Sequence, residues 1–242
     1  MIDFNQSLQI AKSAALLAGD FLLKAQGSDL KILLNQDRDL KLQLDIDTEK
    51  IIKDYISSHS NYSILGEETG LSDKLGEFFW VIDPLDGTSN YFRGLPACCV
   101  SIALLNKDEA FIGVIYDFNE GDLYYSLKGE GAFKNGEKIT VSEISSKEKA
   151  SLTTGIPFSK DIEMTQEYIE FLRPWKKVRM FGSAALSCAY VASGKCDFYH
   201  EKGVYLWDFA AGISLVQEAG GNVQSKEIDD NRYEVIITNG KL

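Results

Sequence analysis

The segment WVIDPLDGTSNYFRGLP, residues 80–96, places two aspartates at the end of an apolar run. The run FFWVID, residues 78–83, predicts a strand that is covered on both faces. Asp86 follows Asp83 by three residues, and within a regular strand that spacing would put the two side chains on opposite faces. We expect Pro84 to end the strand ladder, so that both carboxylates turn into one cleft.

The residues after Leu85 have the pattern of a helix start, with Asp86 as the N-cap and the N–H groups of Gly87 and Thr88 free in the first turn. Free N–H groups at a helix N-terminus attract anions such as phosphate. Two carboxylates beside an anion repel each other and the ligand unless cations lie between them, and Mg²⁺ prefers carboxylate and phosphate oxygens. The pattern therefore indicates a metal-bridged phosphate site, and the alternative is a solvated acidic turn.

Two further acidic stretches favour the metal site. Glu67 and Glu68 follow a short apolar strand in YSILGEE, residues 62–68. Asp208 lies in the mostly apolar stretch YLWDFAAG, where a carboxylate is costly to bury unless it is paired or bound to a metal. The alternative for Asp208 is a cap on the helix that follows, a role compatible with metal binding.

The rest of the chain alternates helical and strand patterns. Helical spacing predicts helices over 3–26, 48–58, 165–175, 182–193 and 207–221, with Thr48 as a possible cap of the second. Apolar runs predict strands over 62–68, 78–83, 98–105, 110–117, 121–127, 196–201 and 231–240, and a hairpin over 129–139. We expect an α/β (α+β) layered sandwich, one compact unit of two parts, 1–140 and 141–242.

Composition narrows the possible partners. The net charge is −11, from 25 basic and 36 acidic residues, so we expect neither nucleic acid nor a membrane as a partner. No stretch approaches the roughly 20 apolar residues of a membrane span, and the N-terminus lacks the pattern of a signal peptide. The cysteines form no CxxC pair and only two histidines are present, which predicts a cytoplasmic protein with reduced thiols and no zinc site.

Several motifs together resemble the inositol monophosphatase family. WVIDPLDGTSNY resembles its first signature and WDFAAGISLVQEAGG its second, while GEE, KGEGAFKNGEKI and FGSAAL are similar to the segments around them. The matching stretches run in family order from Asp47 to Gly221. The resemblance implies alternating helix and sheet layers (αβαβα), a homodimer, and Mg²⁺-dependent hydrolysis of a phosphate monoester by in-line attack of water activated by two or three metal ions.

The resemblance also implies residue roles. The metal ligands would be the carboxylates of Glu67, Asp83, Asp86 and Asp208 and the carbonyl of Leu85, and the amides of Gly87 and Thr88 would hold the phosphate. Asp47 would contact a third metal or its water and, with the Thr88 hydroxyl and Glu67, take part in catalysis. Asp45 competes with Asp47 in LQLDIDTEK, and we prefer Asp47 because it directly precedes Thr48 at the apparent helix start.

The resemblance also implies which residues contact the substrate. Glu201 would contact sugar or inositol hydroxyls, the backbone at Ala184 would approach the substrate, and Arg179 could meet a second phosphate. Solvated loop or surface positions are the alternatives for Glu201 and Arg179. Residues 153–158 would face the substrate, without assigned roles. Asn90 in GTSN favours a small polyol or sugar phosphate such as inositol 1-phosphate.

Other functions stay open. The alternatives are a bisphosphate substrate, either fructose 1,6-bisphosphate or 3′-phosphoadenosine 5′-phosphate, and, more remotely, a non-catalytic regulatory module. An aspartyl-phosphate phosphatase of the haloacid dehalogenase type has a different spacing. It needs its two aspartates at i and i+2, whereas Asp83 and Asp86 are at i and i+3 with Pro84 between them.

Overall fold

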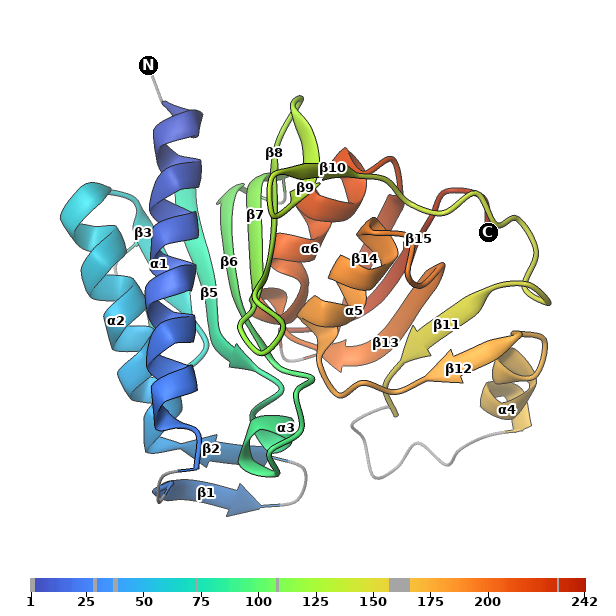
Figure 1. Ribbon diagram of the computed structural model, residues 1–242, viewed down its shortest axis with the longest axis horizontal. Coiled ribbons are helices and arrows are strands. Elements are labelled where there is room, and N and C mark those ends of the chain that lie inside the picture. Colours follow the sequence, from blue (N-terminus) through green and yellow to red (C-terminus); the bar gives the residue numbers. More distant parts are fainter. Residues whose placement is uncertain are drawn as a thin grey trace.

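The protein is a stack of alternating helix and sheet layers. The computed structural model describes residues 3–27, 30–36, 39–72, 74–107, 109–156, 166–229 and 231–242. Figure 1 shows the layers in order: α1 (Phe4–Ala25) with α2 (Gln43–His59), a first sheet, α5 (Ala184–Ala192) with α6 (Leu206–Glu218), a second sheet, and α4 (Gln166–Leu172). The expected αβαβα sandwich is confirmed.

The first sheet has eight strands in the order β10-β9-β8-β7-β6-β5-β3-β4. β3 and β5 run parallel, so their carboxyl ends meet at one edge of the sheet, while the other neighbours are antiparallel. The strands are β3 (Ser63–Gly66), β4 (Gly70–Leu71), β5 (Phe78–Asp86), β6 (Cys99–Asn106), β7 (Glu109–Asp117), β8 (Asp122–Leu127), β9 (Gly131–Lys134) and β10 (Glu137–Ile139).

The second sheet has five strands in the order β12-β11-β13-β15-β14. They are β11 (Ser151–Thr154), β12 (Lys177–Arg179), β13 (Phe198–Val204), β14 (Asn222–Asp229) and β15 (Arg232–Thr238). The sequence patterns did not predict β11, β12 or β14, which are short or mostly exposed. A separate ribbon of β1 (Ile32–Gln36) and β2 (Asp39–Leu42) leads into α2, and the short helix α3 (Thr88–Phe92) follows β5.

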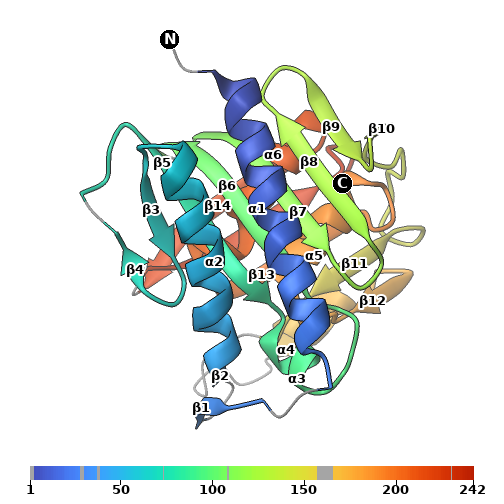
Figure 2. The same ribbon diagram turned by 60° about the vertical axis from the view of Figure 1, so that its left-hand side comes forward.

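Small residues let the layers approach closely. On α1, buried alanines lie against the first sheet, and a Cβ on Gly19 would come within 2.4 Å of the Tyr116 ring. On the other face, a Cβ on Gly113 of β7 would lie 2.1 Å from the Ala211 carbonyl oxygen of α6. Figure 2 shows α1 and α2 lying side by side across one face of the sheet. Within the described chain, no helix combines the length and apolarity needed to span a membrane.

The start of α2 differs from the prediction. The helix begins at Gln43, and Thr48 lies buried inside it, where its Oγ1 donates to the Leu44 carbonyl over 2.7 Å. Asp45, the third helical residue, accepts from the N–H of Leu42 over 2.7 Å. The prediction that Thr48 caps the helix is wrong. β2 runs directly into α2, and the carboxylate of Asp45 accepts from the N–H of the N-cap residue, Leu42.

Candidate active site

The two aspartates of the opening motif lie on the same face of β5. The strand continues through Pro84 to Asp86, contrary to the prediction that Pro84 ends it. Asp83 pairs with Ser101 and Asp86 with Cys99, so Pro84 and Leu85 together face the single residue between these partners. This β-bulge adds one residue to β5 and restores both aspartates to the face that Ser101 and Cys99 share. A bulge also tolerates proline, which has no N–H for the ladder.

Two more carboxylates reach the same edge from other elements. Glu67 follows β3, and because β3 is parallel to β5, it arrives beside Asp83, with which it shares a side-chain hydrogen bond. Asp208 comes from the first turn of α6, where its Oδ2 accepts from the Tyr205 N–H over 2.7 Å. The structure therefore brings together Glu67, Asp83, Asp86 and Asp208.

These acids raise one another's proton affinity. Burial, followed by the charges of Glu67, Asp86 and Asp208, raises the pKa of Asp83 well above its usual value. Burial, then the charges of Asp208 and Glu68, does the same to the pKa of Glu67, although this residue keeps solvent access. Such a group of carboxyls does not ionise fully unless cations neutralise it.

The donor set fits magnesium in its chemistry. Mg²⁺ takes oxygen ligands, and the edge supplies carboxylates together with the buried carbonyl of Leu85. In the described parts of the chain, no three acidic, histidine or cysteine side chains form a ready ion site. Glu67 and Asp83 instead contact each other through their shared hydrogen bond, while Asp86 and Asp208 bind donors of α5 and of Tyr205.

Asp86 also joins the two halves of the chain. Its carboxylate accepts from the Ser183 hydroxyl, from the Ala185 N–H over 2.7 Å and from the Ala184 N–H over 3.3 Å. It therefore caps the N-terminus of α5. Burial raises the pKa of Asp86, and these hydrogen bonds oppose the rise. The predicted substrate contact at Ala184 stays a prediction, since its amide here binds Asp86.

Gly87, which follows Asp86, has a backbone conformation and surroundings that require glycine. Gly87 has φ 91° and is the N-cap of α3, a position that the sequence pattern had given to Asp86. A Cβ on Gly87 would lie 2.7 Å from the carbonyl oxygen of Ala97, so only glycine fits. The Thr88 hydroxyl donates to the Leu85 carbonyl over 3.0 Å, which places Thr88 beside a predicted metal ligand.

The surroundings of Asp45 and Asp47 differ in a way that favours Asp45 as the site residue. Asp47 is exposed and accepts from the side chain of Gln43 over 3.0 Å. Asp45 is 2% exposed, its Oδ1 has no hydrogen-bond partner among the described residues, and its charge raises the pKa of Glu67. Burial raises the pKa of Asp45 to about 7. The preference for Asp47 depended on a helix start at Thr48, whereas the helix begins at Gln43, and the role of either aspartate stays a prediction.

Glu201 faces the cluster from the second sheet. Its carboxylate accepts from the Tyr199 hydroxyl over 3.0 Å, and burial raises its pKa to about 7, with a contribution from the charge of Asp86. A Cβ on Gly155 would lie 1.8 Å from Oε1 of Glu201. The segment 153–158 therefore contributes a glycine that makes room for Glu201, while its residues 157 and 158 lie outside the described residues.

Two predicted substrate residues have structural partners instead. Arg179 is exposed on β12, donates to the Ser151 hydroxyl over 3.1 Å and lies near Cys196, so the structure does not bring it to the carboxylates. Asn90 donates to the carbonyls of Ala97 and Phe181, each over 2.7 Å. Asn90 thus holds the loops around α3 together, and the substrate preference inferred from it stays a prediction.

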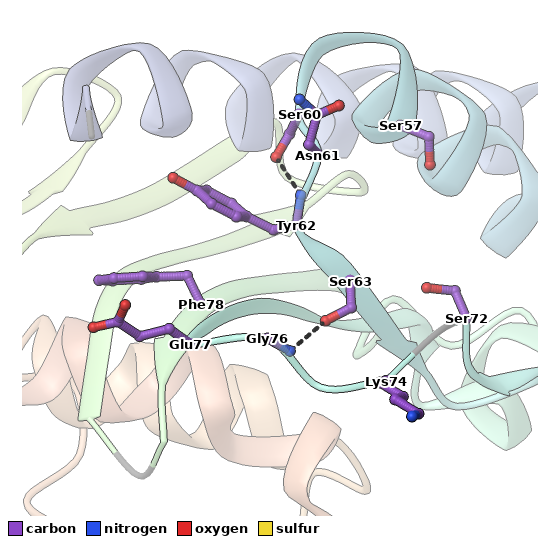
Figure 3. A pocket seen from close by; sticks show the side chains of 10 residues that line it. All are labelled: Ser57, Ser60, Asn61, Tyr62, Ser63, Ser72, Lys74, Gly76, Glu77 and Phe78. Carbon is purple, nitrogen blue, oxygen red and sulfur yellow. Dashed lines mark hydrogen bonds between the residues drawn. The ribbon is translucent and has the colours of Figure 1, made fainter. Parts of the chain in front are cut away.

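A cavity of about 450 Å³ lies at the opposite end of β3 and β5, where Ser63 and Phe78 begin these strands. Its lining hydroxyls bind the chain itself: Ser60 Oγ accepts from the Tyr62 N–H and Ser63 Oγ from the Gly76 N–H (Figure 3). The cavity is therefore separate from the acidic cluster, which follows the other ends of the same strands.

Comparison with known proteins agrees with this geometry. The model of the inositol monophosphatase family matches residues 3–234, and the chain belongs to that family. It is therefore a phosphatase, a phosphoric monoester hydrolase, in a family whose members are generally metal-dependent. This membership agrees with the choice of the i, i+3 aspartates over the aspartyl-phosphate chemistry.

Individual relatives cover nearly the whole chain. A Nus factor SuhB of Pasteurella multocida is 37% identical over 98% of this chain and 90% of its own. An inositol-1-monophosphatase of Synechocystis is 36% identical over 99% of this chain and 87% of its own. The solved inositol monophosphatase of Anabaena (Nostoc) superposes with a TM-score of 0.86 at 35% identity, covering 99% of this chain and 93% of that one.

Proposed function

We propose that the chain hydrolyses the phosphate ester of a small polyol or sugar, such as inositol 1-phosphate, with the help of Mg²⁺. The observation that carries the proposal is the bulge at Pro84 and Leu85, which turns Asp83 and Asp86 to one face of β5. The residues that would hold two or three Mg²⁺ ions are Glu67, Asp83, Asp86, Asp208 and the carbonyl of Leu85.

The raised pKa values of the acids support this assignment. Carboxyls that repel one another in a partly buried cluster become fully ionised once cations neutralise them. When bound, Mg²⁺ would offset the negative charge of the phosphate and lower the pKa of the attacking water.

The remaining residues orient the reactants. The N–H groups of Gly87 and Thr88 would hold the phosphate at the start of α3. Asp45, in place of Asp47, and the Thr88 hydroxyl would orient water for in-line attack. Glu201 would accept a hydrogen bond from a hydroxyl of the leaving alcohol, a role supported by its position between Tyr199 and the charge of Asp86.

The substrate alternatives differ in what they require. A bisphosphate needs a second cationic contact, and the position of Arg179 does not favour one. The names of the relatives differ, since one is a Nus factor and another an inositol-1-monophosphatase, so they select no substrate. The homodimer and the cytoplasmic location stay predictions. The remaining alternative, a purely regulatory module, would release no phosphate from any substrate.

The test is phosphate release from a panel of polyol, sugar and nucleotide phosphates, ranked by kcat/KM, with and without Mg²⁺. We expect Mg²⁺-dependent release from a polyol or sugar monophosphate, and a loss of most of it in Asp83→Asn and Asp208→Asn. Asp117→Asn is the matched control for Asp83→Asn, because Asp117 also lies on a strand of the first sheet and both residues are 2% exposed. Normal turnover in either site variant would contradict the proposal.

A further inference from the structure

A buried glutamate of α2 supports the turn that carries Glu67. Glu49 is fully buried, and its Oε2 accepts from the N–H of Glu68 over 2.7 Å. Its Oε1 accepts from the N–H of Thr69 over 3.1 Å and from the Thr69 hydroxyl. Lys53, one helical turn further along α2, balances its charge at 3.0 Å. One carboxylate thus binds the backbone of the two residues that follow Glu67.

The same carboxylate packs against the residue before Glu67. A Cβ on Gly66 would lie 2.5 Å from Cδ of Glu49, so the carboxylate occupies the space that a side chain would need. The N–H of Glu67 itself donates to the Ile82 carbonyl of β5 over 3.2 Å. The backbone around Glu67 is therefore held by two elements. Glu49 of α2 binds the turn that follows Glu67, and β5 accepts from the N–H of Glu67.

The neighbouring Glu68 is directed elsewhere. Its carboxylate forms an ion pair with Lys41 of β2, and its side chain is 5% exposed. Glu67 instead shares a hydrogen bond with Asp83. The two adjacent glutamates thus have different partners, and this separation depends on the conformation of the turn.

We propose that Glu49 is a positioning residue, which fixes the turn so that the carboxylate of Glu67 meets Asp83 and serves as a metal ligand. This inference rests on the proposed function. Groups that orient metal ligands commonly change metal affinity by about 10-fold or more when they are replaced. A glutamate that only stabilised the fold would change the melting temperature and leave metal affinity unchanged.

The experiment titrates the full chain with Mn²⁺ and follows free Mn²⁺ by electron paramagnetic resonance. We expect Glu49→Gln to weaken Mn²⁺ binding about 10-fold. The glutamine side chain has one acceptor oxygen, so its NH₂ group would face one of the two backbone N–H groups that Glu49 binds. Gly66→Ala disturbs the same contact from the opposite side, and we expect it to weaken binding in the same direction.

Glu218→Gln is the matched control. The Glu218 carboxylate also accepts from two backbone N–H groups of a turn, those of Gly129 at 2.9 Å and Gly131 at 2.8 Å. That turn joins β8 to β9, away from the acidic cluster. We expect this variant to lose stability and to bind Mn²⁺ with unchanged affinity.

The outcomes distinguish a failure of the proposed role of Glu49 from a failure of the proposed function. Unchanged Mn²⁺ affinity in folded Glu49→Gln, or in Gly66→Ala if the first variant does not fold, would overturn the role of Glu49 alone. A similar loss of affinity in Glu218→Gln would also overturn it, since the effect would then follow general destabilisation. An unmodified chain that binds no Mn²⁺ would overturn the proposed function together with this inference.

Discussion

Asp83 and Asp86 lie on one face of β5 although they are three residues apart, because Pro84 and Leu85 face a single residue of β6. Their partners nevertheless differ. Asp83 accepts from the Leu85 N–H over 3.0 Å and meets Glu67, whereas Asp86 accepts from three donors at the start of α5. The carboxyl of Asp83 therefore lies mainly among like charges, whereas the carboxylate of Asp86 is well satisfied by hydrogen bonds.

This difference predicts opposite effects on stability without metal. Asp83→Asn removes a carboxyl whose burial among repelling acids costs stability, and we expect it to raise the melting temperature in EDTA by ~2–4 °C, equivalent to about 1 kcal/mol. Asp86→Asn places an amide nitrogen against the donors of α5 and should lower the melting temperature. Thermal unfolding followed by circular dichroism checks both, and shifts of the same sign would contradict the distinction.

Asp45 and Asp47 provide a test inside one helix. Asp45→Asn should lower kcat/KM by on the order of 100-fold, because it removes a group that we propose orients water. Asp47→Asn changes an exposed side chain two residues away and should leave kcat/KM within about twofold of normal. The measurement is Mg²⁺-dependent phosphate release, and the reverse ranking would restore Asp47 to the site.

Glu201 gives the metal-free protein a dependence on pH. Its pKa in the folded state is raised to about 7, so the folded state holds a proton that the unfolded state releases near pH 4–5. The stability from this group is full below that range and is lost as the pH rises toward 7. We expect Glu201→Gln to flatten the fall of the melting temperature between pH 5 and 8 in EDTA.

A suitable control for this titration is Glu143→Gln, since the side chain of Glu143 is 84% exposed. That variant should keep the slope of the unmodified chain. If the slope of Glu201→Gln matched it, the carboxyl of Glu201 would not be the titrating group.

Lys41 should stabilise the fold through Glu68. Lys41→Met leaves the nearly buried carboxylate of Glu68 without its ion pair, and we expect a loss of about 1–3 kcal/mol in urea unfolding. The matched control is Lys50→Met, because Lys50 pairs with Asp54 where both side chains are about 70% exposed. That change should cost less than about 0.5 kcal/mol, and equal losses would contradict the importance of burial.

The sequence predicted the main helices and strands and singled out the four principal acids because these depend on local patterns, whereas the αβαβα order of the layers followed from the family resemblance. An apolar run that ends in Asp83, and an aspartate at the start of an apolar helix at Asp208, are visible within a few residues. The bulge is different, since it depends on how β5 pairs with β6. Gly155 and Glu201 likewise meet only when β11 and β13 are paired in the second sheet.

The preference for Asp47 came from a wrong helix boundary. The buried residues of α2 follow the helical period through Asp45, Glu49, Ile52 and Ile56. Extending that period back from Ile56 would have selected Asp45 from the sequence. The two readings of Arg179, a phosphate contact or a surface arginine, could not be separated from the sequence, because its position near Phe181 and Gly182 says nothing of the direction of its side chain on an edge strand.

The central claim is that Glu67, Asp83, Asp86 and Asp208 hold the metal ions of a phosphatase. Its most direct test is a crystal soaked in Mn²⁺ and measured near the manganese absorption edge. We predict anomalous difference peaks between these four carboxylates and the Leu85 carbonyl, and the loss of these peaks in Asp83→Asn. Peaks found only elsewhere, or none at this edge of the sheet at saturating Mn²⁺, would contradict it.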